Sequence, residues 1–164
     1  MAGGGSMVGD TEGDMAADRA YMAENDAERE RLRSLVARLS DEELRRPMPG
    51  GWTVASVLAH AGFWDARAIA LMDKWGRGIA PSAADYEPED VDWLNDATKP
   101  LCLALPPRDA AQLALRLAEE ADGKVAALGD ELLAQIRAAG TPFDLSRANH
   151  RREHLDDIER ALGV

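Results

Sequence analysis

The chain contains three histidines, and two of them, His150 and His154, lie four residues apart near its end. On a helix this spacing puts both side chains on one face, with Cβ atoms about 5–6 Å apart. Two imidazoles placed in this way can share one divalent ion at about 2.0–2.1 Å from each nitrogen. The third, His60, lies in a different apolar segment, where the small residues Ala59, Ala61 and Gly62 leave room for another helix to approach. If the two segments pack together, the three imidazoles converge and leave open positions on the metal.

Each of these features also has a plain structural interpretation. A histidine pair four residues apart is common on protein surfaces, and His60 by itself is typical of the edge of a core. Arg151, Arg152 and Glu153, which separate the pair, favour a solvated charged face.

Aspartate, cysteine and tryptophan side chains also bear on a possible site. Asp65 is expected at the surface, and Asp157 is expected either there or beside the histidine pair, where it would orient an imidazole by a hydrogen bond. Cys102, in a Leu-Cys-Leu context, is expected to be a small buried hydrophobic residue. The four tryptophans are expected to form core and pocket walls: Trp52, Trp64, Trp75 and Trp93.

The apolar periodicity predicts an all-α protein. Long helices are expected over about 18–39, 53–75, 108–128 and 146–162. A shorter helix is expected over 130–138. Another is expected to begin at Pro88, and Pro100 should end or kink it. Ser40 followed by Glu43 forms a capping box, and Thr53 is a plausible N-cap. No stretch alternates apolar and polar residues as a strand does. The expected architecture is a four-helix bundle with extra short helices in the connections.

Composition narrows the classes of partner. The 164 residues include 19 Lys and Arg against 30 Asp and Glu, a net charge of −11 that disfavours binding to nucleic acid. No run reaches the roughly 18 apolar residues of a membrane span. Residues 1–17 are rich in Gly and acid and are expected to form a disordered tail, with one domain over 18–164. A single cysteine and no signal-peptide pattern favour a cytoplasmic location.

The order of these motifs resembles the DinB/YfiT-like family of metal-binding four-helix bundles. The resemblance is carried by GWTVASVLAH at residues 51–60, NHRREH at 149–154 and the lead-in LSDEEL at 39–44, and it spans about residues 18 to 162. Two positions depart from the family pattern. Ser56 stands where an acid often completes the helix cap, and Arg151 stands where some subfamilies have an aromatic residue.

The resemblance implies that His60, His150 and His154 bind a divalent transition metal such as nickel or zinc. It further implies a metal-dependent enzyme that activates a thiol or water for attack on a small organic electrophile, with a low-molecular-weight thiol as second cofactor. Relatives include mycothiol-dependent maleylpyruvate isomerase-like proteins, and homodimers are common. Two alternatives stay open: a hydrolase using metal-bound hydroxide, and a non-catalytic helical bundle stabilised by metal or a ligand-binding dimer.

A competing motif lies within the same segment. His150 to His154 also fits His-x-x-Glu-His, a metallopeptidase signature in which the glutamate is the general base. That signature needs a further ligand well downstream, and only ten residues follow His154. The peptidase is therefore rejected, although Glu153 keeps a potential role as a base.

Overall fold

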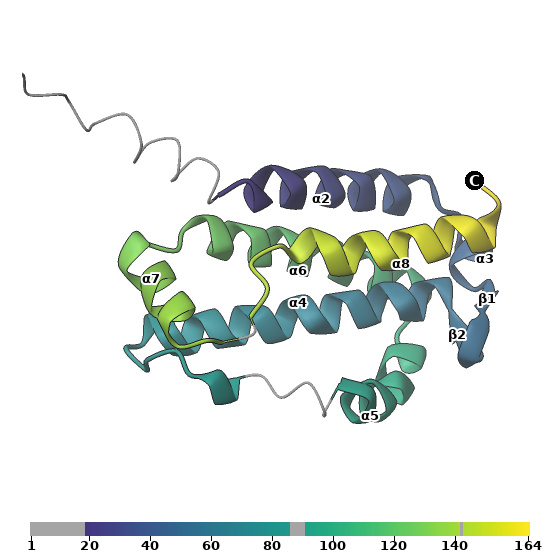
Figure 1. Ribbon diagram of the computed structural model, residues 1–164. Helices are drawn as coiled ribbons and strands as arrows, with labels where there is room; N and C mark the ends of the chain where they lie inside the picture. The colour runs from purple at the N-terminus through teal and green to yellow at the C-terminus, as the bar shows by residue number, and fades with distance from the viewer. Residues whose placement is uncertain (1–18, 86–90, 142) are drawn as a thin grey trace, which may run out of the picture.

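Four long helices form a bundle, as the ribbon of the computed structural model shows (Figure 1). The structure describes residues 19–85, 91–141 and 143–164. Helix α4 packs most extensively against α6, α2 packs against α6 and α8, and α4 also contacts α8. This arrangement confirms the all-α prediction. The predicted tail over 1–17 and the predicted helix start at Pro88 lie outside the described residues. The four helices are α2 (Tyr21–Arg38), α4 (Val54–Gly76), α6 (Pro107–Ala126) and α8 (Arg147–Leu162).

Two capping boxes set where helices begin. The short helix α3 (Asp41–Leu44) follows Ser40, whose hydroxyl accepts a hydrogen bond from the Glu43 amide while the Glu43 carboxylate accepts one from the Ser40 amide. At the start of α4, Thr53 and Ser56 make the same reciprocal pair. The Ser56 hydroxyl thus completes the cap without an acid. Both predicted N-caps are confirmed, and the second fixes the register of the helix that carries His60.

A small hairpin precedes α4, and here the expectation of no strand was wrong. Strands β1 (Pro47–Met48) and β2 (Trp52–Thr53) pair antiparallel, with Met48 opposite Trp52. The turn between them uses positive φ angles of 71° at Gly50 and 75° at Gly51, a conformation that glycine adopts without strain. Two-residue strands are too short to show alternation in a sequence.

Helices α4 and α6 approach closely along a row of small residues. A Cβ atom added at Gly62 would lie 3.2 Å from the Cα of Ala114 and 3.3 Å from Cδ1 of Leu117. The matching face of α6 consists of fully buried alanines: Ala110, Ala111, Ala114, Ala118 and Ala121. Since residues two apart point to nearly opposite sides of a helix, packing α6 at Gly62 leaves the His60 side of α4 for other neighbours.

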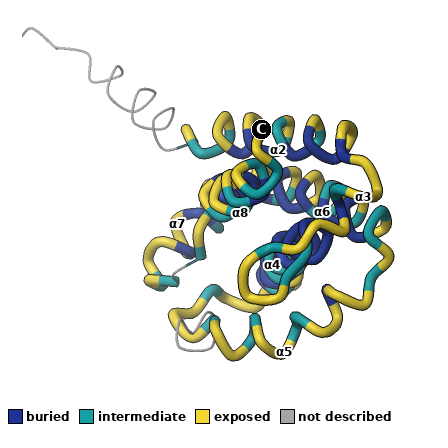
Figure 2. Tube along the Cα trace, turned by 90° about the vertical axis from the view of Figure 1, so that its right-hand side faces the viewer, coloured by how far each residue is buried: buried dark blue, intermediate teal, exposed yellow. Residues whose placement is uncertain are grey.

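Two shorter helices complete the described part of the chain: α5 (Val91–Ala104) and α7 (Asp130–Ala138). Helix α5 continues through Pro100, and it lies outside the bundle on the α4 side, with exposed residues along its outer surface (Figure 2). Trp93 is 66% exposed, so the expectation that it lies in the core was wrong. Cys102 is buried, as expected. No helix within the described ranges is long and apolar enough to cross a membrane.

Candidate metal centre

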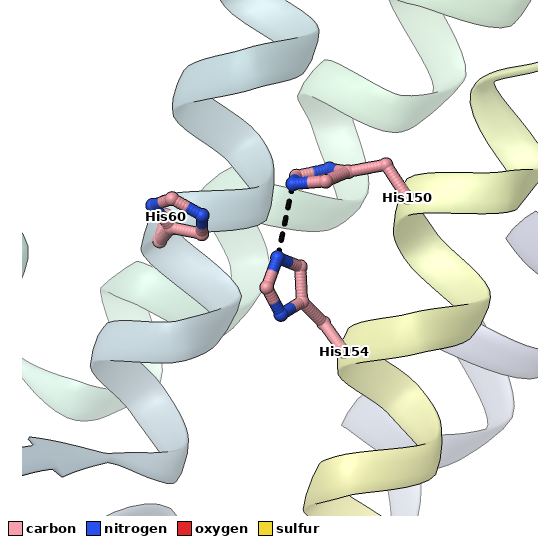
Figure 3. A group of neighbouring side chains, drawn as sticks. All are labelled: His60, His150 and His154. Atoms are coloured by element: carbon pink, nitrogen blue, oxygen red, sulfur yellow. Dashed lines mark hydrogen bonds between the residues drawn. The ribbon is translucent and has the colours of Figure 1, made fainter. Parts of the chain in front are cut away.

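The three histidines meet between α4 and α8. Figure 3 shows the ring of His60 on α4 facing the rings of His150 and His154 on α8. One ring nitrogen from each residue lies within 4.8 Å of the other two, and within the described residues this is the one group of at least three His, Cys, Asp or Glu side chains close enough to hold a metal. The ring centroid of His60 is 5.6 Å from that of His150 and 4.9 Å from that of His154. The predicted convergence is therefore present in the fold.

The spacing of the nitrogens fits a shared ion. The Nε2 atoms of His150 and His154 are 2.9 Å apart. Two nitrogens bound to one ion at about 2.0–2.1 Å, with roughly a right angle between the bonds, lie about 3 Å apart. The Nδ1 atom of His60 is buried and has no hydrogen-bond partner among the described residues. A buried nitrogen without a partner is costly unless something binds it, so the donor set and its geometry suit a divalent metal.

Burial keeps the three imidazoles neutral, the form that binds metals. Burial, assisted by the charge of nearby His154, lowers the pKa of His60 to about 4. For His150, burial and the positive charges of His154 and Arg147 lower the pKa to about 2. Burial also lowers the pKa of His154, against the opposing charges of Glu153 and Asp157. The lowered pKa values favour the neutral form of all three rings at neutral pH, in which one ring nitrogen of each is free of a proton.

One face of α8 carries both the histidine pair and two arginines. Arg147, His150, Arg151 and His154 follow the i, i+3, i+4, i+7 spacing of a single helical stripe. The stripe faces inward at Arg151, of which only 2% is exposed. The interpretation of Arg151 as part of a solvated face was therefore wrong, whereas Arg152 and Glu153 are exposed as expected.

The two arginines of this stripe belong to a buried network of ion pairs. Arg151 donates from Nε to Oδ2 of Asp65 at 3.1 Å and from Nη1 and Nη2 to the two carboxylate oxygens of Asp122, each at 2.8 Å. Arg147 donates from Nε to the other oxygen of Asp65 at 3.1 Å, and Arg29 on α2 donates to Asp122 at 2.7 Å. Asp65 is 2% exposed, so its expected surface position was also wrong. The network joins all four long helices, because Asp65 lies on α4 and Asp122 on α6.

The first turn of α8 is capped from another helix. Ser146 precedes α8 but makes no side-chain cap. Instead, the buried Asn25 of α2 accepts a hydrogen bond from the Ala148 amide at 2.9 Å and donates one to the Leu145 carbonyl at 3.0 Å. Asn25 thereby satisfies a backbone amide that the helix itself cannot pair. This contact places the start of α8, two turns before His154.

Two cavities open beside the histidine cluster, and His60 and His154 line both of them. The smaller cavity, of about 340 Å³, also contains His150 and Trp64. The Trp64 indole donates to the Asn95 side chain of α5 at 3.1 Å, and both residues line that cavity. The larger cavity, of about 930 Å³, is lined in part by Trp52. The Trp52 ring packs edge-on against the His60 ring, with 5.4 Å between the ring centroids. These two tryptophans form pocket walls, as expected.

The two carboxylates near the pair differ in position. Glu153 lines the smaller cavity together with the three histidines. Asp157 lines the larger cavity and accepts a hydrogen bond from Arg160 at 2.6 Å. Among the described residues, Asp157 makes no hydrogen bond to an imidazole, so the predicted orienting bond is absent there.

Comparison with known proteins supports the assignment of the fold. A family model described as the DinB superfamily matches residues 24–155, most of the chain. Searches of the curated proteins and of the solved structures found no match. The matched range includes the lead-in, the α4 motif and both histidines of α8. The chain belongs to the DinB superfamily.

Proposed function

We propose that this protein is a metal-dependent enzyme that activates a thiol or a water molecule for attack on a small organic electrophile. The observation that carries the proposal is the convergence of three neutral imidazoles, from α4 and α8, at the edge of a cavity of about 340 Å³. Three protein ligands leave positions open for reactants, which is typical of catalytic metal sites. A divalent ion bound there would supply a Lewis acid that lowers the pKa of the nucleophile.

Transfer of a thiol is the form that the family resemblance favours, which is an argument from analogy. The sulfur has to come from a small thiol in solution, because the one cysteine of the chain cannot supply it. Cys102 is buried, lies outside both cavities, and has a pKa raised by burial. In the reaction a sulfur–carbon bond forms, the bond from carbon to the leaving group breaks, and the thiol proton passes to solvent.

Hydrolysis is the second candidate, and the position of Glu153 favours it. This carboxylate lines the same cavity as all three histidines and is exposed. A carboxylate so placed can accept the proton of an attacking water molecule as a general base. A hydrolase of this kind would turn over esters or amides without any thiol.

Elemental analysis of the purified protein tests the metal centre first. We expect one equivalent of a divalent metal in the wild-type protein and its loss in His60→Ala and His154→Ala. Glu153→Gln is the matched control, because it changes a cavity residue that is not a proposed ligand, and it should keep its metal. Equal metal content in the wild-type protein and both alanine variants would overturn the proposal.

Activity assays then separate the two reaction types. The metal-loaded protein is incubated with an aryl halide and several small thiols, and separately with a nitrophenyl ester without thiol. Thiol-dependent release of halide supports transfer, whereas ester cleavage that Glu153→Gln slows by at least about tenfold supports hydrolysis. A protein that binds metal and melts at a lower temperature with chelator, yet turns over neither substrate, would instead be a metal-stabilised bundle.

A further inference from the structure

Arg147 is a buried cation among the residues that line the smaller cavity. It lies in the first turn of α8, one turn before His150 and on the same helical stripe. The residue is only 9% exposed, and it lines the cavity together with all three histidines. Neither the metal site nor the proposed nucleophile accounts for a guanidinium group at this position.

The hydrogen bonds of Arg147 leave most of its donors available. Its Nε atom donates to Oδ1 of Asp65 at 3.1 Å, and no other hydrogen bond or ion pair joins its guanidinium to the described residues. Arginine carries five N–H donors, so both Nη groups are open to a ligand. Asp65 also accepts from Arg151, so this carboxylate is shared between two positive charges.

Among the described residues that line the cavity, no acid is buried beside Arg147. Arg67 lines the same cavity and donates to the Asp85 carbonyl at 3.1 Å. The described lining residues include two acids, Asp144 and Glu153, both exposed, and Asp144 accepts hydrogen bonds from Ser146 and Asn149. A bound divalent ion would add further positive charge next to Arg147. The cavity interior therefore favours an anion.

We propose that Arg147 binds a carboxylate of the substrate, so that this site takes small anionic molecules. The inference rests on the proposed function, because the reacting end of the substrate lies at the histidine cluster. A guanidinium binds a carboxylate through two parallel N–H···O bonds, and the two Nη groups provide that fork. The histidines and Arg147 then hold opposite ends of one short molecule, which fixes its orientation as well as its charge.

Thiol binding to the cobalt(II)-loaded protein tests this assignment. Visible cobalt bands report metal binding, and a sulfur-to-cobalt absorption in the near ultraviolet reports thiol binding. Titrations compare 3-mercaptopropionate with its neutral amide, 3-mercaptopropionamide, with 2-mercaptoethanesulfonate as a second anion. We expect the wild-type protein to prefer the carboxylate over the amide by about tenfold, and over the sulfonate by a smaller factor.

Variants of α8 assign that preference to Arg147. Arg147→Met should remove the preference for the carboxylate over the amide, and Arg147→Lys should keep part of it. Arg152→Met is the matched control on the same helix, outside both cavities, and should bind as the wild-type protein does. The intrinsic acidities of the thiols affect every protein by the same factor, so they cancel when the carboxylate-to-amide affinity ratio of a variant is divided by that of the wild-type protein.

The outcomes distinguish this inference from the function on which it rests. A wild-type protein that binds no cobalt overturns the metal centre, and the inference with it. Cobalt binding with equal affinity for the carboxylate and the amide overturns the role of Arg147 alone. If Arg147→Met fails to fold, Arg147→Lys decides: a reduced preference supports the assignment, and an unchanged one overturns it.

Discussion

Asp65 on α4 and Arg151 on α8 are joined inside the bundle, where Arg151 Nε donates to Asp65 Oδ2 at 3.1 Å. The side chain of Arg151 is 1% exposed and that of Asp65 is 3% exposed. The pair lies next to the histidines in sequence and in space, since Arg151 directly follows His150. It connects the helix that carries His60 to the helix that carries the other two imidazoles. The contact between these helices sets how far apart the three rings lie.

Replacing Arg151 should strongly destabilise the fold. Arg151→Met leaves Asp65 and Asp122 without their shared buried partner, and breaking a buried pair costs about 3–5 kcal/mol. We expect a loss of this size in the free energy of unfolding, measured by urea denaturation. The control is Arg152→Met, whose arginine is 44% exposed and pairs with Glu28, and which should cost less than about 1 kcal/mol. Similar losses in the two variants would contradict the structural role given to the network.

The close contact of α4 with α6 predicts a second difference between matched variants. In Gly62→Val the new side chain meets the Ala114 backbone and Leu117, and overpacking of this kind costs about 1–3 kcal/mol. Gly123→Val makes the same change on α6, where an added Cβ has no neighbour within 4 Å. We therefore expect a lower melting temperature for the first variant only. Two equal melting temperatures would mean that the helices are not in contact at Gly62.

Asn25 should contribute to stability as the cap of α8. Asn25→Ala removes the acceptor of the Ala148 amide, and loss of an N-cap costs about 0.5–2 kcal/mol. Ser146→Ala is the control at the usual capping position, where the side chain makes no cap, and should change the free energy of unfolding by less than about 0.5 kcal/mol. Thermal denaturation followed by circular dichroism measures both, and a larger effect at Ser146 would contradict the assignment.

The lowered histidine pKa values predict a pH dependence for the metal-free protein. The pKa of His60 is about 4 in the folded protein and about 6.5 when unfolded, so the unfolded state binds more protons between these values. Stability contributed by the neutral ring is therefore complete above pH 6.5 and is lost as the pH falls towards 4. Each such histidine contributes a slope of about 1.4 kcal/mol per pH unit within that window.

Urea denaturation at intervals between pH 6.5 and pH 5 measures this slope. His60→Gln removes one titrating ring and should flatten the slope by about 1.4 kcal/mol per pH unit. His150, with a pKa of about 2 when folded, should keep the remaining slope positive in the variant. A wild-type protein whose stability is constant across this range would show that the rings are not buried as neutral groups.

The structural features that depend on residues close together in the sequence, such as helix caps and long helices, could be predicted from it. The capping boxes at Ser40 and Thr53 act over three residues, and the apolar spacing of the long helices repeats every turn, so both are visible without a fold. The hairpin at Pro47–Thr53 was missed because two residues per strand carry no periodic pattern. Trp93 was misplaced because its side of α5 faces away from the bundle, which no local pattern indicates.

The meeting of the three histidines was predicted from the sequence, whereas the buried network beside them was not, and their role as metal ligands stays a prediction. All three histidines were identified, since their spacing and rarity are properties of the sequence. Arg151 and Asp65 are 86 residues apart, and each by itself is typical of a surface residue. Only their mutual pairing makes burial favourable, and that pairing is set by the fold. The one available signal was the stripe shared by Arg147, Arg151 and the histidine pair. The domain limits, the homodimer and the cytoplasmic location stay predictions.

The capping of α8 by Asn25 has a consequence for dividing the chain. Asn25 and Ala148 are 123 residues apart, yet the first turn of α8 depends on their hydrogen bond. A fragment that started after α2 would keep all three imidazoles. However, α8, which carries two of them, would begin with an unpaired amide, and its face that packs against α2 would be exposed. Such a fragment would need the missing helix added back as a separate peptide to restore the geometry of its three rings. The presence of the three histidines and their arrangement around one point are thus separable properties of this polypeptide.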